Sequence, residues 1–457
     1  MTEIKKILVA NRGEIAVRII RTCRTMGIAT VAVYSDADHS ALHVALADEA
    51  VAIGPARASE SYLQIGALVE TALRTGCDAI HPGYGFLAES EAFARAVTHA
   101  GLIFVGPDAE TIALMGNKVR ARKAAQDAGL PVLSGSRYFA AEDSEGLAEV
   151  AEQIGYPVLV KAAMGGGGIG MSVAETPDML LSRAALTQRS ALRAFGDGTI
   201  FLERFIRNAR HVEVQVFGFG DGRAVHLHER ECSIQRRFQK VIEESPSPGI
   251  SQNVRARITA AAIALAQACC YAGAGTIEFI VNDDTGEFFF LEMNTRIQVE
   301  HPVTEAVTGI DIVGVQLRLS SGEDMAAELM NSQPSSSGHA IEARLCAENP
   351  ARSFMPSPGR LSVLKLPDNM PGCRVDTGVR EGDEISPHYD SLIAKIICHG
   401  RTRTEAVAGM RAALDATVVE GVTSNLDLLR AVVTSESFQS GRTFTSFLDT
   451  NRDALGI

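Results

Sequence analysis

The sequence predicts an α/β fold built around a parallel sheet, and the pattern that indicates it begins close to the amino terminus. An apolar run at 7–10 is typical of a strand, apolar residues recur at helical spacing over 15–23, and a β-branched run follows at 30–34. A strand, a helix and a second strand in this order predict parallel pairing. Two more short strands are expected at 79–81 and 103–105, and each ends in a Gly/Pro turn. Turns at the carboxyl ends of such strands are where α/β sheets bind ligands.

Beyond residue 134 the pattern changes to a small unit followed by a larger mixed one. The small unit runs from about Gly135 to Phe205 and holds one expected strand, at 158–162. The larger unit extends to 447, and its expected strands lie at 211–217, 224–228, 276–281 and 288–291. A serine-rich loop at 333–338 is the best candidate linker, but it is too short to separate independent domains.

The composition indicates an enzyme-sized, acidic globular protein. Lys and Arg total 43 and Asp and Glu total 55, so the 457-residue chain has a net charge of −12, which argues against nucleic-acid or anionic-membrane partners. Eight cysteines are scattered without a C-x-x-C pair, so neither a zinc site nor a disulfide framework is expected, and the thiols fit a cytoplasmic protein. The start of the chain lacks the features of a signal peptide, and the most apolar helical segment, 260–270, is too short to span a membrane.

The residues from 288 to 302 carry the strongest sign of chemistry. An apolar run at 288–291 is followed by five polar side chains at alternate positions: Glu292, Asn294, Arg296, Gln298 and Glu300. On a strand these positions share one face. We expect a central, buried strand with a functional face, since burying these charges without partners would be costly. The competing interpretation is a half-exposed edge strand with a solvated polar face.

Two neighbouring features predict a nucleotide site. Glu278 lies on an expected strand that precedes the strand of Glu292, and two carboxylates on adjacent strands suit an Mg²⁺ ion that bridges nucleotide phosphates. The glycine run 165–168 follows a strand that ends beside Lys161 and would let backbone N–H groups approach phosphate oxygens. By itself such a run is also typical of a flexible hairpin tip, and neither a P-loop nor a dinucleotide-binding fingerprint is present.

Two further stretches each leave two interpretations open. Lys118 falls in an α/β connection that would face the same cleft, although a lone lysine is more often solvated. The run 229–240 is dense in mixed charge and directly follows the expected strand at 224–228. It is either a solvated face or an anion-binding site.

Taken together, the motifs resemble the biotin carboxylase component of biotin-dependent carboxylases, an ATP-grasp enzyme, over essentially the whole chain. The matching segments are 10–16, 81–87, the glycine run, 210–213, 229–240, 292–304 and 339–344. The resemblance implies an N-terminal Rossmann-like α/β domain at 1–115, connecting helices at 116–134, a small mobile lid at 135–205 and a larger α+β C-terminal domain at 206–447.

The resemblance also implies roles for individual residues. ATP would be held by Lys118, Lys161, Gly165, Gly166, Gly167, Gly168, Glu203 and His211, and the metal by Glu278, Glu292 and Asn294. Bicarbonate would be held by Lys240, Arg296, Gln298 and Val299. Tyr84, Gln235 and Arg344, with His211 beside them, would surround the biotin ureido ring or the phosphate next to it. The catalytic residues would be Glu300 as the base, Arg296 and Lys240.

The implied reaction is the ATP- and bicarbonate-dependent carboxylation of biotin through carboxyphosphate, with ATP and Mg²⁺ or Mn²⁺ as cofactors. No methionine is followed by lysine, so the usual biotin attachment motif is absent and biotin is expected on another chain. The implied partners are a biotin carboxyl carrier protein, carboxyltransferase subunits and a second copy of the chain in a homodimer. The carboxyltransferase would decide the final carboxyl acceptor.

Two positions depart from the family pattern close to the expected nucleotide site. Ile169 stands where the family usually has arginine, and Phe238 stands where it often has histidine. We expect weaker ATP binding or lid closure but retained activity, since neither change removes a metal ligand or Glu300. Two alternatives stay open: another ATP-grasp ligase related to carbamoyl-phosphate synthetase, and an ATP-binding subunit that has lost turnover.

Overall fold

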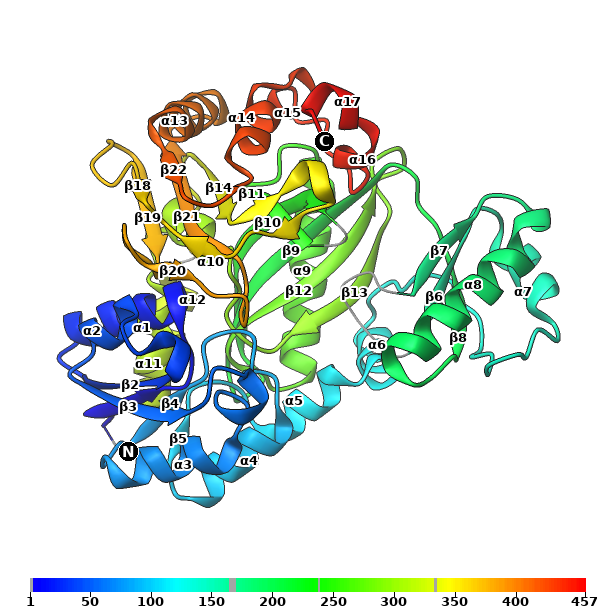
Figure 1. Ribbon diagram of the computed structural model, residues 1–457. Coiled ribbons are helices and arrows are strands. Elements are labelled where there is room, and N and C mark those ends of the chain that lie inside the picture. Colours follow the sequence, from blue (N-terminus) through cyan, green and yellow to red (C-terminus); the bar gives the residue numbers. More distant parts are fainter. Residues whose placement is uncertain (1–2, 164–169, 237–238, 333–334) are drawn as a thin grey trace.

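The structure is a computed structural model that describes residues 3–163, 170–236, 239–332 and 335–457. Its N-terminal part is a five-stranded parallel sheet with the order β3-β2-β1-β4-β5, which confirms the predicted α/β class (Figure 1). The strands are β1 (Lys6–Val9), β2 (Ala29–Ser35), β3 (Glu49–Gly54), β4 (Ala79–His81) and β5 (Ile103–Phe104). The helices are α1 (Gly13–Thr25), α2 (Leu42–Leu46), α3 (Ile65–Arg74), α4 (Glu91–His99) and α5 (Ala109–Gly116). Alternate residues of β1 enter two different apolar cores, which shows that both faces of this sheet are covered.

Two loops at the carboxyl ends of adjacent strands are joined by Asn11. Its side-chain amide donates to the carbonyls of Pro82 and Tyr84, each at 2.7 Å. Gly83 between them has φ +63°, and a Cβ there would come within 2.9 Å of the Asn11 amide nitrogen. Because helix α1 starts directly after β1, this arrangement fixes Glu14 and Tyr84 at the ligand-binding edge of the sheet.

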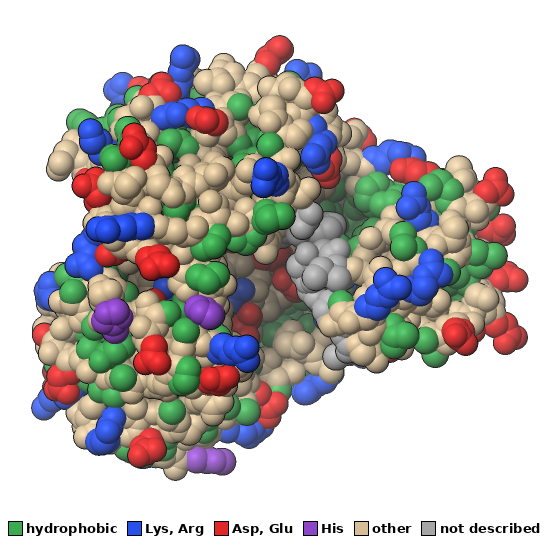
Figure 2. Space-filling model, viewed as in Figure 1, with side chains coloured by type: hydrophobic (Ala, Val, Ile, Leu, Met, Phe, Trp, Pro, Cys, Tyr) green, Lys and Arg blue, Asp and Glu red, His purple; other side chains and the backbone are tan. Residues whose placement is uncertain are grey.

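A separate lobe is built around a three-stranded antiparallel sheet with the order β7-β6-β8 (Figure 1). Helix α6 (Lys118–Asp127) precedes it, and its elements are α7 (Leu147–Ile154), β6 (Val158–Ala162), β7 (Met171–Ala174), α8 (Pro177–Phe195) and β8 (Ile200–Arg204). The sequence predicts only β6 of its strands. Figure 2 shows that the surface is hollowed between this lobe and the rest of the molecule.

The largest layer is an eight-stranded antiparallel sheet with the order β13-β12-β9-β10-β11-β14-β21-β19. Its strands are β9 (Ala209–Phe219), β10 (Ala224–Arg236), β11 (Gln239–Ser245), β12 (Ala272–Asn282), β13 (Phe288–Asn294), β14 (His339–Cys346), β19 (Cys373–Thr377) and β21 (Leu392–Gly400). The strands expected between 211 and 291 all fall within these elements, which confirms them.

Helices pack on this sheet and extend its core. They are α9 (Gln252–Ala268), α10 (His301–Thr308), α11 (Ile312–Ser320), α12 (Met325–Ser332), α13 (Arg403–Ala416), α14 (Leu426–Thr434), α15 (Glu436–Gln439), α16 (Phe447–Thr450) and α17 (Arg452–Leu455). Short strands pair as β15 (Glu348–Asn349) with β16 (Met355–Pro356), β17 (Gly359–Arg360) with β20 (Glu384–Ile385), and β18 (Val363–Lys365) with β22 (Val418–Glu420). The apolar segment expected at 260–270 is the second half of α9. In the part of the chain that the structure describes, no helix is both long and apolar enough to cross a membrane.

Two expectations for the residues from 288 to 302 are wrong. Strand β13 lies at the edge of the eight-stranded sheet rather than at its centre. It also ends at Asn294, so the polar residues from Arg296 to Glu300 lie in a turn and do not share a strand face. The physical reason is the helix that follows: Pro302 stands in the first turn of α10, where a residue without an N–H group begins helices well, and the chain has to leave the strand before it.

The C-terminal part contacts the N-terminal part through main-chain atoms at Gly378. This residue follows β19, and a Cβ placed on it would lie 2.4 Å from the backbone nitrogen of Glu14. The missing side chain therefore lets the chain after β19 pass directly against the start of α1. This contact brings Glu14 to the eight-stranded sheet.

Candidate active site

A cleft of about 620 Å³ lies where the eight-stranded sheet meets the N-terminal loops. Its volume is typical of a small-molecule site. Most residues singled out from the sequence line it: Tyr84, His211, Lys240, Glu278, Glu292, Asn294, Arg296, Gln298, Val299, Glu300 and Arg344. Lys118, Lys161, Glu203 and Gln235 are not among the described residues that line it.

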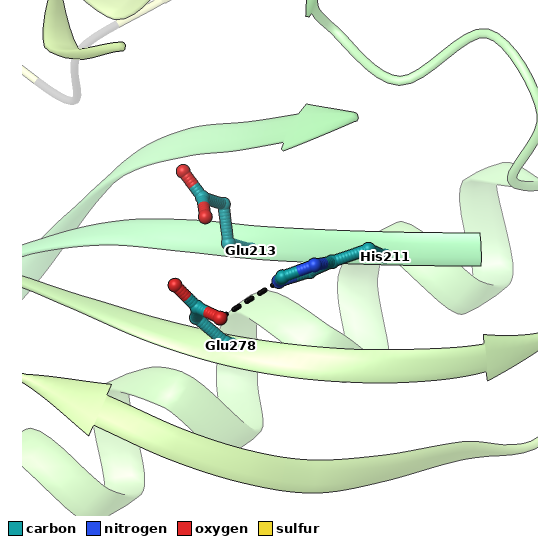
Figure 3. Close-up of side chains that lie close together, drawn as sticks. All are labelled: His211, Glu213 and Glu278. Atoms are coloured by element: carbon teal, nitrogen blue, oxygen red, sulfur yellow. Dashed lines mark ion pairs between the residues drawn. The ribbon is translucent and has the colours of Figure 1, made fainter. Parts of the chain in front are cut away.

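A row of charged side chains crosses four strands on the cleft side of the sheet. Arg230 on β10, Glu213 on β9, Glu278 on β12 and Glu292 on β13 stand directly opposite one another across each strand boundary. Opposite residues of an antiparallel pair project from the same face. Figure 3 shows His211, Glu213 and Glu278 pointing into the same space, and one potential ligand atom of each lies within 4.8 Å of the others.

Lys240 neutralises three carboxylates at the centre of this cleft. Its Nζ donates to Glu213 at 2.5 Å, to Glu278 at 3.0 Å and to Glu300 at 2.5 Å. Burial alone would lower the pKa of Lys240, but the carboxylates raise it well above its usual value. Burial would raise the pKa of Glu300, but Lys240 and Arg344 outweigh it and hold that pKa well below its usual range. At neutral pH, Lys240 is therefore protonated and Glu300 is ionised.

Arg230 is fully buried behind the cleft and holds several of its residues in place. It donates to Glu213 at 2.6 Å and to Gln298 at 3.0 Å, and Gln298 in turn donates to Glu278 at 2.9 Å. Its remaining acceptors are Gln215, Thr276 and Thr304. The side-chain amide of Gln298 is thus engaged at both ends by the protein itself.

The predicted metal ligands lie together. Glu278 and Glu292 face each other across β12 and β13, and the Asn294 amide donates to Glu278 at 2.9 Å. The Glu278 charge, with burial adding to it, raises the pKa of Glu292, which shows that the pair is short of positive charge. His211 pairs with Glu278 at 2.8 Å. Carboxylate and amide oxygens are the ligands that Mg²⁺ prefers, so these residues fit this ion.

Lys118, the first residue of α6, and Lys161, on β6 of the lobe, are two interacting positive charges. Lys161 donates to Glu203 at 2.8 Å, and Arg122 reaches the same carboxylate at 3.4 Å. Burial and the charge of Lys161 lower the pKa of Lys118, while Glu292 and Glu203 act in the opposite sense. The two lysines therefore repel each other, and an anionic group placed between them would relieve that repulsion.

Two arginines border Glu300. Arg344 donates to Glu300 at 2.8 Å and also pairs with Glu243. Arg296 donates to Glu89 at 2.9 Å, and the charge of Glu300 acts on it as well. Because both guanidinium groups line the cleft, they can meet an anion in front of Glu300.

The predicted biotin residues lie in two places. The Tyr84 hydroxyl donates to Glu14 at the cleft wall. The Gln235 amide contacts the His211 Nδ1 atom at 2.5 Å and donates to the Cys232 carbonyl at 2.7 Å. Gln235 therefore supports His211 from behind. The glycines 165–168, Ile169 and Phe238 fall outside the described residues.

Four residues of the site are missing from the sequence prediction: Glu89, Arg122, Glu213 and Arg230. Glu213 had a usable signal, since it lies two residues after His211 and must share its strand face. Arg230 falls inside the charged run at 229–240, but a charged run does not show which member is buried. Glu89 and Arg122 meet their partners across 207 and 81 residues of sequence, and no local pattern indicates such pairing.

Comparison with known proteins gives consistent matches along the chain. Residues 3–112 match the family model for the biotin carboxylase N-terminal domain, residues 117–328 the model for the carbamoyl-phosphate synthase L chain ATP-binding domain, and residues 342–450 the model for the biotin carboxylase C-terminal domain. Biotin carboxylase 1 of Bacillus subtilis (strain 168) is 48% identical over 453 residues, which are 99% of this chain and 100% of the relative. The mitochondrial methylcrotonoyl-CoA carboxylase subunit alpha of Glycine max is 47% identical over 99% of this chain and 62% of the relative.

Comparison with solved structures gives matches to the same family. The biotin carboxylase domain dimer of Hydrogenobacter thermophilus 2-oxoglutarate carboxylase, in complex with MgADP, ADP and bicarbonate, matches with a TM-score of 0.92 at 41% identity, covering 100% of this chain and 99% of that one. Campylobacter jejuni biotin carboxylase, in a β,γ-ATP complex, matches with a TM-score of 0.92 at 40% identity, covering 98% and 99%.

Proposed function

This chain belongs to the biotin carboxylase family, and from that membership we propose a role for each group in its cleft. The protein is an ATP-dependent ligase that carboxylates biotin with bicarbonate. The observation that carries the residue roles is the Lys240 cluster, because it joins Glu213, Glu278 and Glu300 in one buried network.

Glu300 is the proposed base. Bicarbonate is a poor nucleophile, so it has to lose its proton as it attacks the γ-phosphorus of ATP. Once bicarbonate shares the charges of Lys240 and Arg296, Lys240 stabilises the Glu300 carboxylate less, and Glu300 becomes a stronger base. The proton passes to Glu300, the bicarbonate oxygen bonds to phosphorus, and the bond from phosphorus to the ADP oxygen breaks. The products of this step are carboxyphosphate and ADP.

ATP binding is proposed for Lys118, Lys161, Glu203 and His211, together with the glycines 165–168. The paired lysines would contact phosphate oxygens, and Glu203 would release Lys161 for that purpose. Glu278, Glu292 and Asn294 would hold Mg²⁺, which when bound neutralises charge on the phosphates. We propose the lobe at 135–205 as a lid, since carboxyphosphate exposed to water would hydrolyse.

The second step uses the same pocket. Carboxyphosphate breaks down to carbon dioxide and phosphate, the phosphate takes the N1 proton of biotin, and N1 bonds to the carbon of carbon dioxide. Arg296 would stabilise the negative charge that develops on the ureido oxygen. Tyr84 and Arg344 border this part of the cleft, and they would contact the ring. Gln235 would act through His211.

The chain works as a carboxylase subunit. We propose that its biotin arrives on a biotin carboxyl carrier protein, that carboxyltransferase subunits use the product, and that the chain forms a homodimer. The methylcrotonoyl-CoA carboxylase relatives support an acyl-CoA as the final acceptor. The dimeric structure of the Hydrogenobacter thermophilus domain supports the homodimer.

The test is the rate of ATP cleavage with Mg²⁺, measured with and without bicarbonate and then with free biotin. We expect cleavage that needs bicarbonate, rises with biotin and is lost in Glu300→Gln. Glu436→Gln, an exposed glutamate far from the cleft, serves as the matched control. Cleavage indifferent to biotin would favour another ATP-grasp ligase, and tight ADP binding without any cleavage would favour a subunit that has lost turnover.

A further inference from the structure

One fully buried cation behind the cleft has no role in the reaction described above. Lys395 lies on β21, and its side chain is 0% exposed. Its Nζ pairs with Glu14 at 3.0 Å, lies 3.8 Å from Asp376, and donates to the Val299 carbonyl at 2.8 Å. A lysine is seldom fully buried unless its charge is paired, and these partners compensate the cost of burying the Lys395 ammonium group.

Lys395 belongs to a second cross-strand row of charges. Arg344 on β14, Lys395 on β21 and Asp376 on β19 stand opposite one another in the sheet register. All three therefore project from the same face. Burial would lower the pKa of Lys395, but Glu14, Glu342 and Asp376 outweigh it, so Lys395 stays protonated.

Neighbouring members of this row bind two consecutive residues of the site segment, one through its side chain and one through its main chain. Arg344 binds the carboxylate of Glu300, and Lys395 binds the carbonyl of Val299, the residue directly before it. This segment lies past the end of β13, where no ladder of strand hydrogen bonds fixes it. Besides two long main-chain hydrogen bonds, from His301 to Gln298 and from Val303 to Glu300, each at 3.3 Å, its orientation depends on such side-chain contacts. A displacement of about 1 Å at a reacting group can cost about a hundredfold in rate.

The same ammonium group also reaches the N-terminal part. Glu14 pairs with Lys395 and accepts a hydrogen bond from the Tyr84 hydroxyl. Lys395 therefore touches, through one atom, the peptide that carries the proposed base and the carboxylate that holds Tyr84.

We propose that Lys395 is a positioning residue for the reaction, fixing the Val299–Glu300 peptide and the Glu14–Tyr84 pair relative to each other. It touches no substrate and acts through these neighbours. The inference rests on the proposed role of Glu300 as base.

The test compares Lys395→Met with Arg403→Met in steady-state ATP cleavage with bicarbonate. Methionine keeps the length of the lysine side chain but has no donor and no charge. Arg403 is the control: like Lys395 it is a cation paired with a buried carboxylate, here Glu244, but it does not line the cleft, and among the described contacts it makes none with 299–300. We expect kcat to fall about 10- to 100-fold in Lys395→Met, with the KM for ATP within about twofold of wild type, because the nucleotide residues are untouched. Arg403→Met keeps most of the wild-type kcat.

A folded Lys395→Met enzyme with kcat within about twofold of wild type overturns the inference. So does an equal loss of kcat in Arg403→Met, because the loss would then follow from removing any paired cation. Should Lys395→Met fail to fold, Lys395→Leu, which also has no donor and no charge, replaces it under the same criteria. Failure of the proposed function appears in the wild type, as ATP cleavage that does not need bicarbonate, and is thereby distinguished from failure in the variants alone.

Discussion

Replacing Arg230 by methionine is expected to destabilise the protein strongly. Arg230 is 0% exposed, and it donates five hydrogen bonds to side chains around it. Breaking a buried ion pair from one side costs about 3–5 kcal/mol of unfolding free energy. Glu213 keeps Lys240 as a second partner, so we expect the lower end, about 3 kcal/mol.

Differential scanning calorimetry measures this change directly. For a unit of 150–250 residues, about 3 kcal/mol corresponds to a fall in melting temperature of about 6–12 °C. Arg223→Met is the matched control, since Arg223 pairs with Asp221 on the surface and such pairs contribute little. If Arg230→Met melted within about 2 °C of wild type, or no lower than Arg223→Met, the reasoning about the buried network would be refuted.

Three more changes have defined outcomes. Glu292→Gln is expected to raise the Mg²⁺ concentration for half-maximal activity at least about tenfold, and to raise the melting temperature without Mg²⁺, because it relieves the repulsion with Glu278; unchanged Mg²⁺ dependence would contradict this. Lys161→Met is expected to raise the KM for ATP about tenfold, whereas exposed Lys123→Met leaves it unchanged, and equal KM values in the two variants would exclude a phosphate contact for Lys161. Burial, opposed by Arg344, raises the pKa of Glu243 to about 7, so its contribution to stability is complete below its usual pKa of 4.5 and is lost as the pH rises to 7. Melting temperatures across that window should fall less steeply in Glu243→Gln, and parallel curves would show that Glu243 is not the titrating group.

The sequence was enough to predict four of the five strands of the N-terminal sheet, because each of the four contains a short apolar run, but it missed the edge strand β3, which is mostly exposed. It was also enough to bring Glu278 and Glu292 together, since their strands are consecutive and joined by a short turn. It failed at Asn294, where alternation of polar residues continues past the end of the strand. Polar residues at alternate positions are typical of one face of a strand. The turn that places polar groups around Lys240 has polar residues at the same spacing, so the sequence pattern does not distinguish the two.

The buried network could not be predicted from the sequence, because its partners are set by strand register. The side chains become neighbours only through the pairing of β9 with β10 and with β12, which sets Glu213 opposite Arg230 and Glu278. No single segment of the sequence shows the order of strands in an antiparallel sheet. Lys395 had a local sign, as a single lysine within the apolar run 392–398, and a lysine in such a strand needs a buried partner.

The close contact at Gly378 couples the position of Glu14, in the N-terminal part, to the C-terminal part of the molecule. A methyl group at this position would overlap the backbone of Glu14 and push the first turn of α1 away from β19. Glu14 would then separate from Lys395, and Tyr84 would move with it. Since Tyr84 is a proposed contact of biotin, we expect a substitution of Gly378 to be detected first as weaker binding of biotin.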